Sequence, residues 1–317
     1  AALGDSATSR RSGARRVRHV LEGPFEEASE GGGNGVAQLV LQEAHASSTG
    51  DWSGHKIWPA ALALLEHLHR GRGGALRGLR VLELGCGLPL LAAALAALGA
   101  EVCATDHPEV LPHAEDVLAA EGAFLGAQLR GLAPEARERL RLRPLAWGGG
   151  EVAARNLSAL CDFSGPVDLL VGADLVYHDF PLEPLRATLV SALRAQGASA
   201  VLALQPRRFP MAAALKEPRR VASFLKSLSA EGSDWEVHLD KPGKEFGASL
   251  GEDAVEGLVI ATVTPEGARA RGRRQGEGGA GAAGRGIGYR REELEEAAGD
   301  KVVPEQPKPG PPRTLEL

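Results

Sequence analysis

The stretch VLELGCGL, residues 81–88, decides the fold of this 317-residue chain. Its first half is an apolar run typical of a buried strand, and it leads into Gly85 and Gly87 before an apolar run of helical length. A second strand-like run, VCAT at 102–105, ends on Asp106. A strand, a glycine turn, a helix and a second strand ending in a carboxylate are typical of a nucleoside-cofactor pocket. The stretch therefore predicts an α/β sheet with such a pocket at the carboxyl ends of its strands.

Further strands and crossover helices follow along the chain. Strand-like runs occupy 79–84, 101–105, 140–146, 167–172, 199–204, 235–239 and 255–263. The first five alternate with runs of helical period, whereas the last two follow each other across a loop. We therefore predict a Rossmann-like α/β fold with a seven-stranded, mostly parallel sheet and one antiparallel strand at its C-terminal edge. Upstream, 36–42 and 55–58 predict an added N-terminal strand pair, and 124–139 predicts a helical insertion.

Three regions of the chain differ in composition. Residues 1–35 are rich first in arginine and serine and then in glycine and glutamate, which predicts a disordered or targeting leader. Residues 266–317 are rich in glycine, arginine and alanine and then in glutamate and proline. They hold too few apolar residues to offset the entropy of ordering, so we predict a disordered low-complexity tail. Residues 36–265 are the predicted folded domain.

Composition and charge narrow the class of protein. The 41 acidic residues outnumber the 36 Lys and Arg residues, so the chain as a whole has no attraction for nucleic acid. Only three cysteines occur, without motif spacing, so we expect neither a disulfide framework nor a bound metal. The longest apolar run, 88–100, falls short of the roughly 20 residues that span a bilayer. We expect a monomeric cytoplasmic protein, or an organellar one if the arginine-rich start is a transit peptide.

The glycine stretch also indicates the kind of cofactor. Gly85 and Gly87 lack a Cβ atom where a ligand would approach the backbone, and Glu83 could order this loop or receive an ammonium group. Asp106 could accept the hydroxyls of a ribose, or it could cap the next helix. A dinucleotide pocket prefers a third glycine where Leu90 stands. The pattern therefore favours S-adenosylmethionine, a nucleoside cofactor without a pyrophosphate.

Two further markers follow the next strands of the predicted sheet. Trp147 comes after the run 140–146 and offers a flat ring on which adenine could stack, unless it is a core or lid residue. Asp174 and Tyr177 come three residues apart after the run 167–172, where the donor's sulfur would point. Loop capping and ring packing are the alternative roles for this pair.

Five motifs together extend the prediction: IWPAA at 57–61, VLELGCG at 81–87, TD at 105–106, LAWG at 145–148 and ADLVY at 173–177. Their combination resembles the seven-β-strand protein lysine methyltransferases of the methyltransferase-like family. The resemblance implies a class I methyltransferase fold over 36–265 that transfers a methyl group from S-adenosylmethionine to a lysine of a target protein. It places Asp174 and Tyr177 at the target amine. It also implies a cofactor pocket lined by Trp58, Gly85, Cys86, Gly87, Asp106, Trp147 and Ala173.

Two other functions stay open from the sequence. A methyltransferase acting on a small molecule or on protein arginine would share the cofactor motifs. This alternative stays open because the lids that define the acceptor are not visible in one sequence. A module that binds the cofactor without catalysis would work through partner contacts. Basic residues that could serve acidic partners or RNA are Arg207, Arg208, Lys216, Arg219, Arg220 and those within 269–274. They lack interleaved aromatic residues, so a solvated face is the expectation for them.

Overall fold

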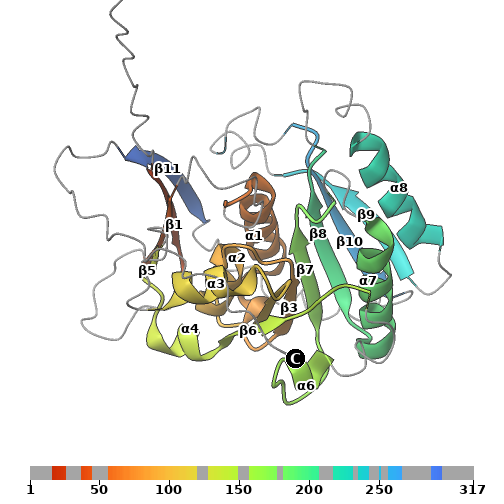
Figure 1. Cartoon of the computed structure of the whole chain (residues 1–317), viewed down its shortest axis with the longest axis horizontal. Helices are drawn as coiled ribbons and strands as arrows, with labels where there is room; N and C mark the ends of the chain where they lie inside the picture. The colour runs from red at the N-terminus through yellow and green to blue at the C-terminus, as the bar shows by residue number, and fades with distance from the viewer. Residues whose placement is uncertain are drawn as a thin grey trace, which may run out of the picture.

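The computed structural model describes residues 16–25, 37–44, 56–119, 128–148, 157–176, 181–206, 217–230, 235–242, 250, 256–265 and 287–294. A central sheet lies between two layers of helices, and a second, smaller sheet lies beyond one of these layers (Figure 1).

The central sheet has seven strands in the order β6-β4-β3-β7-β8-β10-β9. Their bounds are β3 Arg80–Leu84, β4 Glu101–Asp106, β6 Leu140–Pro144, β7 Leu169–Ala173, β8 Ser199–Leu204, β9 Trp235–Asp240 and β10 Val259–Pro265. Neighbouring strands pair in parallel except β10, which runs antiparallel to both β8 and β9. The predicted mostly parallel sheet with one antiparallel strand is confirmed. The chain order reverses at β3, which lies between β4 and β7, and ligands bind at such a point in doubly wound sheets.

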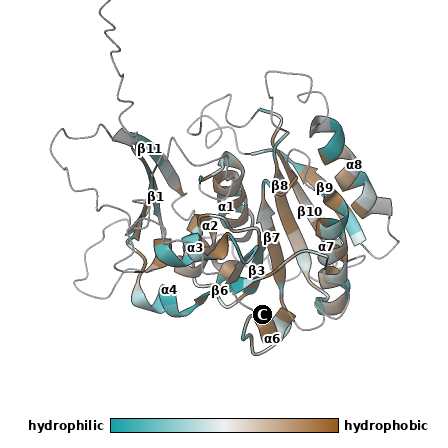
Figure 2. Ribbon diagram, in the orientation of Figure 1, coloured by the Kyte–Doolittle hydropathy of each residue, from teal (hydrophilic) through white to brown (hydrophobic). Residues whose placement is uncertain are grey.

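Helices cover both faces because successive strand side chains point to opposite sides. Val81 packs in the core on the side of α1 (Pro59–Arg72), α2 (Leu90–Ala97), α3 (Leu111–Leu118) and α4 (Pro134–Glu138). Leu82 packs in the core on the side of α6 (Leu157–Leu160), α7 (Leu182–Gln196) and α8 (Glu217–Ala230). A short 3-10 turn, η2 (Gly73–Leu76), follows α1. Figure 2 shows the central strands as mainly hydrophobic and the outward sides of α4 and α8 as hydrophilic.

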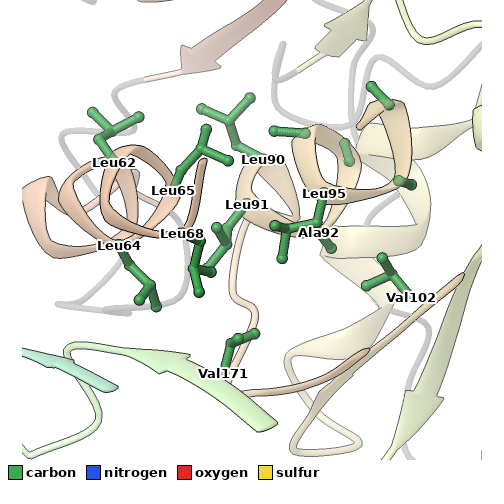
Figure 3. Close-up of a cluster of buried hydrophobic side chains, with 14 of the residues drawn as sticks. Leu62, Leu64, Leu65, Leu68, Leu90, Leu91, Ala92, Leu95, Val102 and Val171 are labelled. Atoms are coloured by element: carbon green, nitrogen blue, oxygen red, sulfur yellow. The ribbon is translucent and has the colours of Figure 1, made fainter. Parts of the chain in front are cut away.

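Helix α2 is buried on every side, which matches its sequence LLAAALAA. Leu65 and Leu68 of α1 lie against Leu90 and Leu91 of α2, with Val171 of β7 beneath them (Figure 3). The small alanines let the helix approach its neighbours closely. This packing fixes the start of α2, directly after the glycine stretch.

The second sheet has the order β11-β1-β2-β5 and is antiparallel throughout. Its strands are β1 Arg16–Gly23, β2 Ala37–Ala44, β5 Gln128–Arg130 and β11 Gly288–Leu294. Leu21 and Leu39 from this sheet, with Ile287 directly before β11, join the same buried cluster as α1 and α2. The second sheet is therefore packed onto the helical layer beside β3.

This sheet corrects several predictions. Disorder is wrong for 16–23 and for 288–294, because β1 and β11 pair along their length and β1 buries Val17, Val20 and Leu21. The predicted pairing of 36–42 with 55–58 is also wrong: β2 pairs with β1 and β5, and 56–58 is not a strand, while His55 lies outside the described residues. The predicted helical insertion contains the short strand β5 as well as α4.

Candidate functional site

A cavity opens at the carboxyl ends of β3, β4 and β7, where the strand order reverses. It brings together the eight predicted cofactor residues and one of the two predicted catalytic residues. These lining residues are Trp58, Glu83, Gly85, Cys86, Gly87, Asp106, Trp147, Ala173 and Asp174. Residues far apart in the chain thus meet where the fold predicts a ligand.

The glycine stretch needs its glycines for both conformation and space. Gly85 and Gly87 have φ angles of 66° and 48°, which side-chain-bearing residues seldom adopt. A Cβ atom on Gly85 would also lie 2.7 Å from Cδ2 of Leu175 and 3.3 Å from the ring of Trp147. The backbone here therefore stays bare on the cavity side, so that a ligand can approach it closely.

Asp106 ties the end of β4 to the glycine stretch. Its carboxylate accepts hydrogen bonds from the Gly87 N–H at 2.8 Å and the His107 N–H at 2.7 Å. Burial raises the pKa of Asp106, and the two N–H donors oppose this shift. The predicted alternative, a cap for the next helix, does not occur, because α3 begins at Leu111 without a side-chain cap. Each carboxylate oxygen accepts two hydrogen bonds, so Asp106 keeps capacity for two ligand hydroxyls.

Glu83 is a buried carboxylate on the cavity wall, only 3% exposed. Burial, followed by the charge of Asp106, raises the pKa of Glu83 well above its usual value, while a hydrogen bond from the Ala92 N–H opposes this. Among the described residues, Oε2 of Glu83 has no hydrogen-bond partner. A buried carboxylate oxygen with open capacity beside a cavity suits a positively charged ligand group. This arrangement fits the ammonium and sulfonium groups of S-adenosylmethionine.

Two tryptophans that are far apart in the sequence belong to the cavity wall. Trp58 immediately precedes α1, and its carbonyl accepts a hydrogen bond from the Ala61 N–H at 2.9 Å. Trp147 follows β6 and lies near Gly85, in a segment anchored by a 2.8 Å hydrogen bond from the Gly148 N–H to Oγ1 of Thr188. Both indoles offer flat apolar surfaces for a planar base.

Asp174 follows β7 in an unusual backbone conformation. Its φ angle is 57°, and its N–H donates a 2.8 Å hydrogen bond to the Ala203 carbonyl on β8. The side chain is buried and lines the cavity. Non-glycine residues at positive φ cluster at functional sites, where the fold holds them against strain. Tyr177, the second predicted catalytic residue, lies outside the described residues, so the role of this pair stays a prediction.

Several lining residues escaped the sequence prediction: Lys56, Ile57, Ala61, Leu88, Leu91, Val110 and Leu175. Leu88 and Leu91 could have been found, because they are three residues apart at the start of the helix after the glycine stretch. Ile57 belongs to the motif IWPAA, of which only Trp58 was assigned to the pocket, and Lys56 lies outside every motif, so only the tertiary structure brings these two residues to the cavity.

Other predicted features lie away from this cavity or carry no site. Arg219 and Arg220 are on α8, while Arg207, Arg208, Lys216 and the range 269–274 lie outside the described residues. Within the described ranges, no three His, Cys, Asp or Glu side chains group as metal ligands would. No helix in the part of the chain that the structure describes has the length and apolar character needed to cross a membrane.

Comparison with known proteins identifies the family. Residues 37–229 match the family model described as lysine methyltransferase. The chain belongs to this family. It is an S-adenosylmethionine-dependent lysine methyltransferase, and the predicted family, activity and cofactor are confirmed.

Relatives of this lysine methyltransferase include two curated proteins. Protein N-lysine methyltransferase METTL21A of Danio rerio is 31% identical over 209 residues, which cover 64% of this chain and 82% of that protein. EEF1A lysine methyltransferase 3 of Mus musculus is 30% identical over 139 residues, covering 44% of this chain and 49% of that protein. Among solved structures, magnesium protoporphyrin IX methyltransferase of Synechocystis PCC 6803 aligns at 15% identity and a TM-score of 0.39, covering 69% and 89% of the two chains.

Proposed function

We propose that this lysine methyltransferase methylates a lysine side chain of a protein and binds its cofactor in the cavity at the end of β3. The assignment rests chiefly on one observation, that nine residues predicted from separate motifs line this single cavity. A protein acceptor follows the names of the relatives from Danio rerio and Mus musculus.

Within the cavity, each side chain is assigned a role by its chemistry. Asp106 accepts the two ribose hydroxyls with the oxygen lone pairs that its backbone contacts leave open. Glu83 receives the ammonium group with its open oxygen, and the indoles of Trp58 and Trp147 flank the adenine. Gly85, Gly87 and Ala173 leave space for the ligand because they are small. S-adenosylmethionine supplies an electrophilic methyl group on its sulfonium.

Asp174 is the proposed residue at the acceptor amine. A lysine amine has a pKa near 10.4 and must lose a proton before it can attack the methyl group. The buried carboxylate of Asp174 would orient the amine, and the phenol oxygen of Tyr177 would accept a hydrogen bond from it, while the proton leaves to solvent. Alignment of the two reactants in an enclosed site supplies most of the rate.

Two substitutions separate cofactor binding from transfer. Asp106→Ala should abolish measurable S-adenosylhomocysteine binding in calorimetry, whereas Asp174→Ala should bind the product normally and lose turnover. Activity is measured as transfer of a labelled methyl group from S-adenosylmethionine to proteins of a cell lysate, followed by mass spectrometry of the labelled residue. Label on small solutes or on arginine would contradict the proposed acceptor. Tight binding by Asp106→Ala would contradict the proposed cofactor site.

We also propose that the enzyme is a monomer of the cytoplasm and does not act on nucleic acid. The excess of acidic over basic residues supports the last point, because phosphate backbones are bound mainly through Lys and Arg. Gel filtration with light scattering and a nucleic-acid binding assay would test the oligomeric state and the nucleic-acid point.

A further inference from the structure

A chain of polar contacts runs from the second sheet to the wall of the cofactor cavity. The Tyr289 hydroxyl on β11 lies 3.0 Å from Nδ1 of His19 on β1. Nε2 of His19 lies 3.0 Å from Oε1 of Glu43 on β2, and the same oxygen accepts a hydrogen bond from the backbone N–H of Ile57. Ile57 lines the cavity. We call Tyr289, His19 and Glu43 the Glu43 relay.

Two of the three relay residues are buried, and Tyr289 is half-buried against the apolar core. His19 is 4% exposed and Glu43 is 5% exposed, and the rings of His19 and Tyr289 stack with centroids 6.0 Å apart. Burial raises the pKa of Tyr289 to about 12, so its hydroxyl keeps its proton at neutral pH and can donate to Nδ1 of His19. Buried polar groups cost free energy unless they are paired. The Tyr289–His19 hydrogen bond and the 3.0 Å contact between Nε2 of His19 and Glu43, which lies outside hydrogen-bond geometry, therefore join the three strands at one place.

The relay ends at a segment of the cavity wall that has no regular secondary structure. Residues 56–58 belong to neither a strand nor a helix. Lys56, Ile57 and Trp58 nevertheless all line the cavity. The hydrogen bond from the Ile57 N–H to Glu43 thus connects the middle residue of this segment to β2.

We infer that Glu43, His19 and Tyr289 are positioning residues that hold the Lys56 to Trp58 wall in its ligand-binding place. Strand β11, more than 20 residues beyond the end of the central sheet, thereby contributes to cofactor affinity without touching the cofactor. This inference rests on the proposed cofactor site.

Exposed ion pairs on the same strands provide a matched comparison. Arg290 pairs with Glu22 at 3.0 Å and Arg18 pairs with Glu292 at 3.4 Å, with more than half of the Arg290 side chain exposed. Exposed pairs of this kind contribute little to stability. They join β1 to β11 as the relay does, but at the solvent-exposed surface.

Four variants of the whole 317-residue chain test the relay. Tyr289→Phe keeps the ring and removes the hydroxyl, and Glu43→Ala removes the acceptor for Ile57. Glu43→Gln keeps an amide oxygen as acceptor, and Arg290→Gln is the control. We expect Tyr289→Phe and Glu43→Ala to raise KM for S-adenosylmethionine and Kd for S-adenosylhomocysteine about three- to tenfold, with kcat at saturating cofactor close to that of the wild type. Glu43→Gln should recover part of the affinity, and Arg290→Gln should change nothing.

Hydrogen exchange without cofactor provides a second readout. In Glu43→Ala, the peptide containing Ile57 should exchange faster, while peptides of α2 and β4 keep their protection. A cofactor Kd within about twofold of the wild type in both Tyr289→Phe and Glu43→Ala would overturn the inference, whether or not exchange changes. A fall in kcat and melting temperature with unchanged KM would also overturn it, because that pattern indicates a purely structural role. Failure of the wild-type enzyme to bind S-adenosylhomocysteine would instead contradict the proposed cofactor site.

Discussion

Replacing Glu83 by glutamine should stabilise the enzyme and weaken its cofactor binding at the same time. The amide has nearly the shape of the carboxylate, and its oxygen can still accept the hydrogen bond from the Ala92 N–H. What it removes is a buried negative charge close to that of Asp106. That charge is unfavourable in the empty cavity but complements a bound ammonium group.

The magnitude follows from the raised pKa of Glu83, which burial and the Asp106 charge hold well above its usual 4.5. A carboxyl with a raised folded pKa contributes a stabilisation that is complete below the unfolded pKa and is lost as pH rises through the folded value. Each unit of difference corresponds to about 1.4 kcal/mol. Each kcal/mol shifts the melting temperature of a domain this size by about 2–4 °C. Glu83→Gln should thus melt close to the wild type near pH 4.5 and several degrees above it at pH 8.

The same substitution, Glu83→Gln, should also lower the affinity for the cofactor. A hydrogen bond to a charged group contributes about 1.5–3 kcal/mol, which corresponds to a weakening of roughly 10- to 150-fold. Because the ionised form of Glu83 is the one that pairs with an ammonium group, wild-type affinity should also rise with pH until Glu83 is fully ionised.

Melting curves at several pH values and calorimetric titration with S-adenosylhomocysteine at pH 8 measure both effects. Glu101→Gln is the control. Glu101 is the first residue of β4, at the opposite end from Asp106, so this change removes a carboxylate that lies away from the cavity. A Glu83→Gln protein with wild-type affinity and no gain in melting temperature at pH 8 would refute the argument.

Three further predictions concern the loop, an ion pair and the thiols. Gly85→Ala should lower the free energy of unfolding by about 1–3 kcal/mol, because the φ angle is 66° and the methyl group meets Leu175 at 2.7 Å, and urea unfolding measures this. Burial raises the pKa of Asp168, but the hydrogen bonds and charge of Arg80 outweigh burial, so the pKa of Asp168 is lowered overall. The stabilisation that ionised Asp168 contributes is therefore present above its unfolded pKa and is lost as pH falls through its folded pKa. Asp168→Asn should therefore destabilise the enzyme at pH 7 more than at pH 3 in urea titrations, without changing KM for the cofactor. Burial, then the charges of Glu83 and Asp106, raise the pKa of Cys86, so its thiol should resist iodoacetamide at pH 8 until the enzyme is unfolded, as measured by mass spectrometry.

The central sheet was predictable because its signals are local. Apolar runs of strand length alternate with helical periods, and the run 81–88 places its glycines and the following helix within one crossover unit. The antiparallel strand β10 was predictable too, since 235–239 and 255–263 follow each other without a helix. In such a sheet the order of the strands largely determines where a ligand binds.

The second sheet was not predictable from the same signals. Strand β1 combines Val17, Val20 and Leu21 with charged residues, but it lies in an arginine-rich segment whose composition indicates disorder. Strand β11 is a short run in a low-complexity region, and its partner His19 is 270 residues away from Tyr289. Pairing over such a separation leaves no local periodicity to detect.

The sequence by itself determined the sheet, the glycine stretch, the type of cofactor and the family, because each is read from patterns that are local to single strands, turns and helices. Only the tertiary structure decided which residues surround these elements. It placed Lys56 and Ile57 on the cavity wall and left Glu83 with an open buried oxygen. It also connected the wall to β11 through Glu43 and His19. These features depend on side chains that meet across strands distant in the sequence, where burial and pairing are set by packing and not by any pattern along the chain.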